Sequence, residues 1–217
     1  MAVQLYEKHR PAKFQDVIGH WRVKQRLLAL RENVGWDNQV FWFAGPSGVG
    51  KTTAARLIAN TVSDEFATEE INAAKLSVDL LDNWERKCAS KPLIGGAWCF
   101  VVNEAHMLST RVVSELLTVL EEGHVQNNST WLFTTTKIGQ RRFDGKLDAC
   151  PFLSRALCFE FTVDEDYLNE GAERLLSIAQ SVNMDGQGIG AYVKLLTACE
   201  GNMRQAIQFI ASGGMIE

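Results

Sequence analysis

The chain has 217 residues, of which 46% are hydrophobic and 22% are charged. This length and composition suit a globular protein with one sizeable core and room for a small second domain. The formal net charge of −4 argues against a protein that coats nucleic acid indiscriminately, although it is compatible with a local basic face.

No apolar run approaches the roughly 18 residues of a membrane span, and the first residues form no apolar signal segment. We therefore expect a cytoplasmic protein without a membrane partner. The five cysteines are scattered and show no CxxC pairing or zinc-like spacing. We expect them to be buried free thiols.

Short apolar runs rich in aromatic and β-branched residues recur along the first three quarters of the chain, with helical patterns between them. Because the runs are apolar on both faces, they predict an α/β fold with a parallel sheet covered by helices on each side. Including one weaker run, we expect five strands, near residues 39–45, 69–75, 97–103, 130–136 and 156–162.

After residue 162 the pattern becomes purely helical, with segments at 164–182, 186–200 and 202–212. We expect an α/β domain over residues 1–162 and a small helical lid domain over 163–217.

The stretch GPSGVGKT, residues 45–52, fits the pattern G-x-x-x-x-G-K-[ST], follows a predicted strand and opens a predicted helix. Glycines let the backbone curl so that its N–H groups converge on a polyphosphate at the helix N-terminus, which an ordinary glycine-rich turn would not do. Lys51 is expected to reach the β- and γ-phosphates and Thr52 to ligate Mg²⁺. The predicted nucleotide-binding residues of this loop are Gly45, Pro46, Ser47, Gly48, Val49, Gly50, Lys51, Thr52 and the adjoining Thr53.

The strand at 97–103 delivers Asn103 and Glu104 to the sheet edge where α/β proteins bind ligands. Glu104 could polarise a water for attack on the γ-phosphate. Asn103 stands where an Asp would hold the metal, and it lacks the charge that favours Mg²⁺. We expect Asn103→Asp to raise turnover at limiting Mg²⁺. His106 is interpreted as a structural hydrogen-bonding residue, with metal ligation as the alternative.

Beyond these motifs, the chain resembles the AAA+ module of clamp-loader ATPase subunits, of the bacterial DNA polymerase III gamma/tau and replication factor C small-subunit types. The resemblance rests on five stretches in the order of that family: YEKHRPAKFQDVIGH (6–20), NEAHMLSTRVVSELLTVLEE (103–122), TWLFTTTK (130–137), LSRALCFEF (153–161) and GNMRQAIQ (201–208).

The resemblance implies the AAA+ P-loop NTPase fold, an ATP and Mg²⁺ cofactor pair, and a role for particular residues. Thr136 falls at the sensor-1 position. Arg155 would be an arginine finger for a neighbouring subunit, with a surface salt bridge as the alternative, and Arg204 would touch the γ-phosphate in its own site, with a solvated helix position as the alternative. The adenine pocket would be formed by Arg10, Pro11, Val17 and Ile18.

The resemblance also implies partners: other clamp-loader subunits in a hetero-oligomeric ring, a sliding clamp and primer-template DNA. The chain departs from the family at Asn103 and at Ala156, which replaces a Cys, and the sequence shows no cysteine-rich zinc insertion. We also expect no C-terminal collar domain, either because the sequence is a fragment or because assembly is supplied otherwise. Without a collar we expect the isolated chain to be monomeric and nearly inactive.

DNA contacts implied by the resemblance fall near Lys75 and Ser77 and at residues 109–111, at helix N-termini. The basic run KIGQRRFDGK (137–146) is interpreted instead as a solvated loop.

Three functions remain open at this point. The first is an ATP-hydrolysing clamp-loader subunit. The second is a nucleotide-binding structural subunit with little hydrolysis because of Asn103. The third is another AAA+ ATPase acting on DNA, such as a branch-migration helicase.

Overall fold

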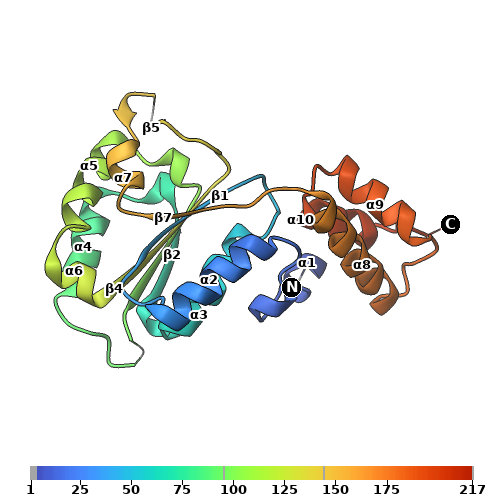
Figure 1. Ribbon diagram of the computed structural model, residues 1–217, viewed down its shortest axis with the longest axis horizontal. Coiled ribbons are helices and arrows are strands. Elements are labelled where there is room, and N and C mark those ends of the chain that lie inside the picture. Colours follow the sequence, from blue (N-terminus) through green and yellow to red (C-terminus); the bar gives the residue numbers. More distant parts are fainter. Residues whose placement is uncertain (1–3, 95, 144, 217) are drawn as a thin grey trace.

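The computed structural model describes residues 4–94, 96–143 and 145–216. Five parallel strands form one sheet in the order β2-β3-β4-β1-β7, and helices cover both of its faces (Figure 1). The predicted five-stranded parallel sheet is therefore confirmed, including its weakest strand. The strands are β1 (Val40–Ala44), β2 (Thr68–Asn72), β3 (Trp98–Asn103), β4 (Ser129–Thr135) and β7 (Leu157–Glu160).

Successive side chains of each central strand point into two separate cores. In β1, Phe41 and Phe43 face one core while Trp42 faces the other. This alternation explains why the strands are apolar throughout, because both faces of the sheet are buried. The first core contains side chains of α2 (Trp21–Asn33) and α3 (Lys51–Val62), and the second contains side chains of α4 (Val78–Cys88), α5 (Thr110–Val119), α6 (Gly123–Asn128) and α7 (Cys150–Leu153).

In the described part of the chain, four α-helices begin at side chains that cap them. Backbone N–H groups in the first turns of α4, α5, α8 (Glu165–Ser181) and α10 (Met203–Ala211) donate to the side chains of Ser77, Ser109, Asp164 and Asn202 respectively. Such caps satisfy donors that the helix itself leaves unpaired. Single-turn 3-10 helices occupy Phe14–Asp16, Glu65–Ala67, Ala73–Lys75 and Ala105–Met107.

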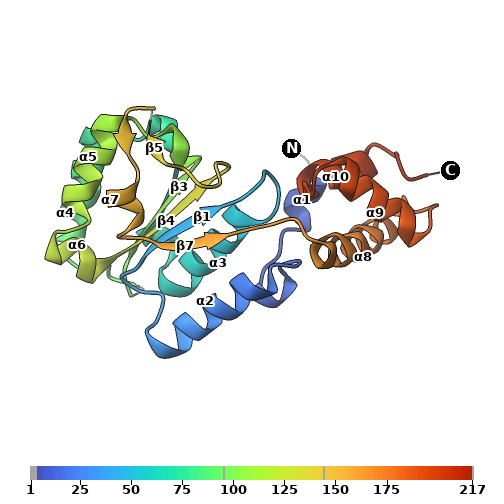
Figure 2. The same cartoon turned by 45° about the horizontal axis from the view of Figure 1, so that its top comes forward.

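Beyond β7 the chain crosses to a helical group formed by α8 (Glu165–Ser181), α9 (Ile189–Ala198) and α10 (Met203–Ala211), which extends from one end of the sheet (Figure 1). The short helix α1 (Leu5–Lys8) packs against α10, so both ends of the chain meet in this group (Figure 2). The three predicted helices are present. The division into domains at residue 162 stays a prediction.

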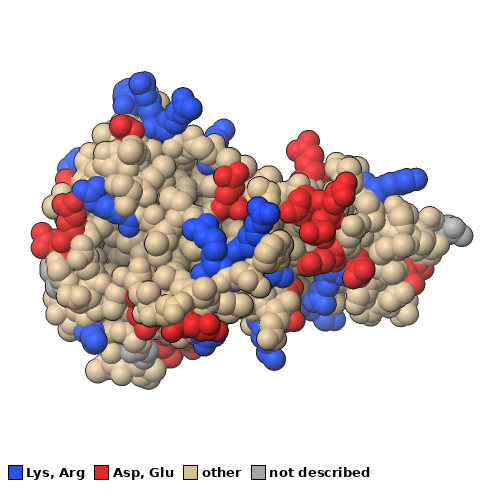
Figure 3. Space-filling model, viewed as in Figure 1, with Lys and Arg blue, Asp and Glu red and all other residues tan. Residues whose placement is uncertain are grey.

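The basic run at 137–146 contains a feature that its composition hides. Its Lys and Arg side chains are exposed, as the loop interpretation requires, but β5 (Arg142–Phe143) and β6 (Leu147–Asp148) pair as an antiparallel hairpin, and Phe143 is fully buried. The buried ring packs against Trp42 and Phe152 and so fixes the segment to the second core. Figure 3 shows Lys and Arg side chains gathered at the end of the molecule where Figure 1 places this hairpin.

The prediction of buried cysteines is correct for three of them and wrong for two. Cys88, Cys99 and Cys199 are buried free thiols, whereas Cys150 and Cys158 are exposed because they lie on outward positions of α7 and of the edge strand β7. Among the described residues, no helix is long and apolar enough to cross a membrane.

Candidate nucleotide site

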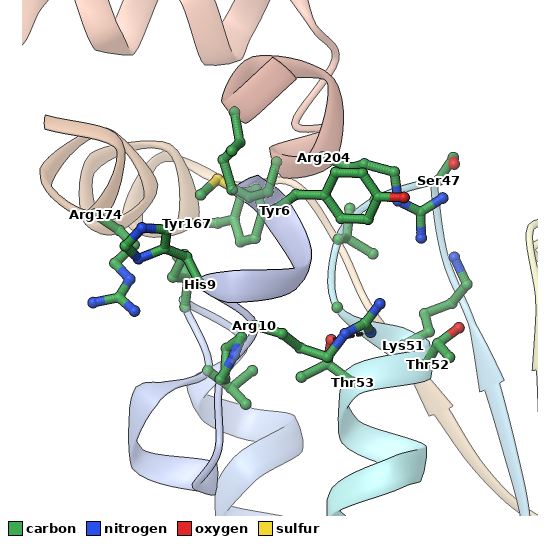
Figure 4. A pocket seen from close by; sticks show the side chains of 18 of the residues that line it. Tyr6, His9, Arg10, Ser47, Lys51, Thr52, Thr53, Tyr167, Arg174 and Arg204 are labelled. Carbon is green, nitrogen blue, oxygen red and sulfur yellow. Dashed lines mark hydrogen bonds between the residues drawn. The ribbon is translucent and has the colours of Figure 1, made fainter. Parts of the chain in front are cut away.

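A cleft lies where the loop after β1, the N-terminal segment and the helical group meet (Figure 4). The loop with Lys51 and Thr52 forms one side of it, and His9 with Arg174 lies on the opposite side. Elements from both ends and the middle of the chain therefore build one cleft. Its lining residues are Tyr6, His9, Arg10, Pro11, Val17, Ile18, Ser47, Gly48, Val49, Gly50, Lys51, Thr52, Thr53, Glu104, Thr134, Tyr167, Arg174, Ile178, Met203, Arg204 and Ile207.

The loop after β1 depends on glycine for its shape. Gly45, Gly48 and Gly50 have φ angles of 154°, 76° and 106°. Residues with a Cβ atom rarely adopt such positive φ angles, whereas glycine does so readily. A Cβ on Gly48 would also lie 1.9 Å from Oδ1 of Asn202, at the start of α10. The sequence therefore forms a tight turn that ends at the N-terminus of α3 and touches the helical group.

Lys51 is a cation buried without a charged hydrogen-bond partner. Only 6% of the residue is exposed, and Nζ donates to the backbone oxygens of Gly45 at 2.8 Å and of Pro46 at 2.5 Å. Burial lowers the pKa of Lys51 to about 8, although the nearby Glu104 opposes this shift. An anion in the cleft would give this ammonium the counter-charge that it lacks, as a phosphate does.

The predicted metal-side residues are in contact with one another. The Thr52 hydroxyl donates to Oδ1 of Asn103 at 3.0 Å, and the Thr134 hydroxyl donates to the same atom at 2.9 Å. The other half of the Asn103 amide donates from Nδ2 to Oε1 of Glu70 at 2.7 Å. Hydroxyl and amide oxygens suit Mg²⁺, which usually takes few protein ligands and completes its shell with phosphates and water.

Glu104 follows β3 in a left-handed backbone conformation, with φ 56°. A charged residue held in this sparsely populated region commonly marks a functional position. Its carboxylate accepts a hydrogen bond of 3.4 Å from Thr136 and lies 3.4 Å from Nδ1 of His106.

His106 also lies 3.2 Å from the Thr135 hydroxyl, as expected for a structural hydrogen-bonding residue. In the described part of the chain, no group of three or more His, Cys, Asp or Glu side chains could hold a metal by itself.

The residues expected around the adenine, Arg10, Pro11, Val17 and Ile18, all line the cleft. Arg10 donates from Nη1 to the hydroxyl of Thr53 at 3.2 Å, which ties the N-terminal segment to the first turn of α3. The part of the cleft that is expected to hold an adenine ring therefore lies next to the loop after β1.

Arg204 lines the cleft from the first turn of α10, with its guanidinium 5.3 Å from the ring centre of Tyr6. Arg155 does not line the cleft. It forms an ion pair with Glu121, and 34% of its side chain is exposed. The salt-bridge alternative is therefore correct within one chain, and the role of Arg155 in a neighbouring subunit stays a prediction.

Several cleft residues have no signal in the local sequence. They come from the two ends of the chain and meet only in the folded protein: Tyr6, His9, Tyr167, Arg174, Ile178, Met203 and Ile207. His9 is notable because its Nε2 is buried and has no hydrogen-bond partner among the described residues. Burial, followed by the charge of Arg174, lowers the pKa of His9. Its neutral ring could hydrogen-bond a ligand in the cleft.

His20 contacts the loop after β1 through the Val49 carbonyl. It is buried, its Nε2 lies 3.0 Å from the Val49 carbonyl, and its ring packs against Phe161 and Tyr167. Burial lowers the pKa of His20, so the ring is held neutral. His20 and Val49 are 29 residues apart, so no local sequence pattern indicates this hydrogen bond.

The positions considered for DNA contacts lie at helix ends. Ser77 and Ser109 are the N-caps of α4 and α5, and Lys75 and Arg111 are exposed nearby. The 3-10 turns Ala73–Lys75 and Ala105–Met107, which precede these helices, contact each other. The geometry is compatible with a shared surface, whose role stays a prediction.

A family model described as "AAA domain (dynein-related subfamily)" matches residues 41–142, which include the phosphate loop, Asn103 and Glu104. Among curated relatives, the replication factor C small subunit of Natronomonas pharaonis is 27% identical over 97% of this chain, and the DNA polymerase III subunit tau/gamma of Haemophilus influenzae is 29% identical over 96%. The chain is therefore similar in sequence to clamp-loader subunits, and its sheet and helices have the arrangement of the AAA+ P-loop fold.

These relatives are longer than this AAA+ chain, which spans 62% of the first and 32% of the second. Among solved structures, the RuvB Holliday junction branch migration motor of Thermotoga maritima superposes with a TM-score of 0.68, 22% identity and coverage of 93% of this chain and 64% of that one. Because the identity is low, this likeness supports the AAA+ fold alone.

Proposed function

We propose that this AAA+ chain is an ATP-hydrolysing clamp-loader subunit that, with partner subunits, opens a sliding clamp and loads it onto primer-template DNA. The single observation that carries the nucleotide part is the cleft in which Lys51, Glu104 and Arg204 converge. The clamp-loading part rests on the similarity to replication factor C and DNA polymerase III subunits.

The residues of the cleft fit ATP from end to end. The orphaned Nε2 of His9 and the pocket around Val17 and Ile18 suit a base, and the buried ammonium of Lys51 suits the phosphates. Mg²⁺, when bound with ATP, would offset phosphate charge, and Thr52 and Asn103 are the side chains that would hold it.

Hydrolysis in this proposal depends on positioning. Glu104 lines the cleft and would orient the attacking water, and Thr136 would hold the carboxylate through its 3.4 Å hydrogen bond. Arg204 would contact the γ-phosphate from α10. Arg155 is outside the cleft, so it could reach a nucleotide only in the site of a neighbouring subunit.

Asn103 favours a second candidate, a subunit that binds nucleotide and offers Arg155 to a neighbour but hydrolyses little ATP. Against it stands the observation that Glu104, the residue expected to activate water, is present and faces the cleft. The third candidate, another AAA+ ATPase acting on DNA, has a RuvB-like fold in its favour, but the identity to the RuvB motor described above is only 22%.

Steady-state ATPase of the chain assembled with candidate clamp-loader partners, measured with and without primed DNA and a sliding clamp, tests the proposal. We expect turnover that rises when DNA and clamp are added together and that Glu104→Gln removes. Turnover equal in wild type and Glu104→Gln would leave the structural-subunit function. Stimulation by branched DNA without any clamp would favour the third candidate.

A further inference from the structure

The amide of Asn103 is held in one orientation by partners on both sides. Oδ1 accepts from the hydroxyls of Thr52 and Thr134, while Nδ2 donates to Glu70 on the neighbouring edge strand β2. The Glu70 carboxylate can only accept, whereas the two hydroxyls can donate or accept, so the reversed amide would lose the bond to Glu70 and set its oxygen against that carboxylate. The oxygen therefore faces Thr52, on the side where a metal would bind.

Glu70 is itself fixed by a second partner. Arg56, one turn beyond Thr52 on α3, donates from Nε to Oε2 at 2.7 Å and from Nη2 to Oε1 at 2.9 Å. Such two-bond pairing gives the carboxylate a defined position. The chain thus places a carboxylate 2.7 Å behind the Asn103 nitrogen, where the second oxygen of an Asp at position 103 would meet a like charge.

We propose that Glu70 is a positioning residue of the metal side of this site: it orients the Asn103 amide and supplies, from the adjacent strand, the negative charge that position 103 lacks. The inference rests on the proposed nucleotide function. In this proposal Asn103 offers its amide oxygen to the metal, and the Glu70 carboxylate accepts from the amide nitrogen on the other side.

Two consequences separate this unit from an ordinary surface ion pair. Asn103→Asp adds a second charge instead of restoring a missing one, so the metal-free variant should be less stable than wild type. Exchanging both residues, in Asn103→Asp with Glu70→Gln, keeps the total charge and lets the new amide donate to the new carboxylate. Because 28% of the Glu70 side chain is exposed and Arg56 offsets part of its charge, we expect moderate effects.

The experiment titrates Mn²⁺, a substitute for Mg²⁺, into the full chain held in excess over ADP, and follows the free ion by electron paramagnetic resonance. Glu70→Gln should weaken Mn²⁺ binding about threefold to tenfold, and the exchanged double variant should bind within about twofold of wild type. Arg56→Gln should strengthen Mn²⁺ binding, because it removes the cation that offsets Glu70.

Glu69→Gln is the matched control. Glu69 is the preceding residue on the same strand, but its carboxylate accepts from Trp84 and pairs with Lys87 instead of Asn103. It should leave the Mn²⁺ affinity unchanged. Thermal melting of the metal-free variants gives a second reading. Glu70→Gln should raise the melting temperature when it is added to Asn103→Asp, and leave it equal or lower when it is made in the wild-type chain.

Equal Mn²⁺ affinity in wild type and Glu70→Gln, or a double variant no better than Glu70→Gln, would overturn the inference even if every protein binds ADP. If wild type binds no ADP at all, the proposed nucleotide function fails and takes the inference with it. The ADP titration that precedes the metal titration tells these two failures apart.

Discussion

Nε of Arg155 donates a hydrogen bond of 2.9 Å to Oε1 of Glu121 in the same chain. The two side chains are 34% and 58% exposed, so their pairing contributes about 0–1 kcal/mol and can be exchanged for another anion at low cost. If Arg155 contacts the phosphates in a neighbouring subunit, Glu121 would be its ion-pair partner in the free subunit.

If Arg155 acts across a subunit boundary, Arg155→Ala should lower ATP turnover of the assembled complex about 1,000-fold or more, as loss of an arginine finger does. ADP affinity of the isolated chain should not change, because Arg155 lies outside its cleft. The exposed Arg142 on the hairpin provides the control substitution, Arg142→Ala. Full turnover by wild-type monomers, independent of protein concentration, would contradict the role.

We expect Lys51 to make nucleotide affinity pH-dependent. Its pKa is lowered from the usual 10.5 to about 8, so the free protein loses this charge as the pH rises through 8. Phosphates prefer the charged form, and binding above pH 8 must therefore take up a proton. We expect ADP affinity, measured by calorimetry, to fall from about pH 7 to about pH 9.

Lys51→Ala should bind ADP weakly and show little of this pH dependence. Lys91→Ala, at an exposed position, should behave as wild type does. Equal ADP binding by wild type and Lys51→Ala would exclude the loop as the phosphate site.

Glu104→Gln should reduce turnover of the assembled complex by at least about 100-fold while ADP affinity stays within a factor of two or so, since the carboxylate would act on water and not on the bound phosphates. Glu115→Gln, on the exposed side of α5, is the matched control. Rapid-quench measurement of a single turnover would locate the loss in the chemical step. A normal single-turnover rate would remove Glu104 from its proposed role.

Gly48→Ala tests the packing of the loop against α10. The new methyl group would meet Asn202 at 1.9 Å with a φ of 76°, so we expect a loss of about 1–3 kcal/mol in the free energy of unfolding and weaker ADP binding. Gly188→Ala, where nothing lies within 4 Å of the added carbon, should be close to neutral. Urea denaturation of both variants makes the comparison. Equal urea midpoints for Gly48→Ala and wild type would mean that the loop accommodates the methyl group without loss of stability.

The sheet and the glycine turn of the GPSGVGKT loop could be predicted because their signals are local. A strand apolar on both faces, followed by GPSGVGKT and a helix, specifies its own shape through glycine and helix-end chemistry. Arg204 and the adenine residues required a resemblance to known proteins, because nothing in their immediate neighbours indicates a ligand.

Glu70 and His20 could not be predicted in this way. Each acts through a partner brought close by the fold, Glu70 across neighbouring strands to Asn103 and His20 over 29 residues to Val49. The burial of Phe143 could not be predicted for a different reason: the basic run holds only Ile138 and Phe143 as large apolar residues, and their spacing shows no strand or helix periodicity, although Phe143 anchors the hairpin.

The packing of α1 against α10 has a consequence for the order of folding. During synthesis the strands β1 to β7 leave the ribosome long before residues 203–211, so the sheet can form while the cleft still lacks one wall. Contacts between segments this far apart in sequence form slowly because a long loop must close first. A newly made chain would therefore hold its sheet before α10 docks and completes the cleft.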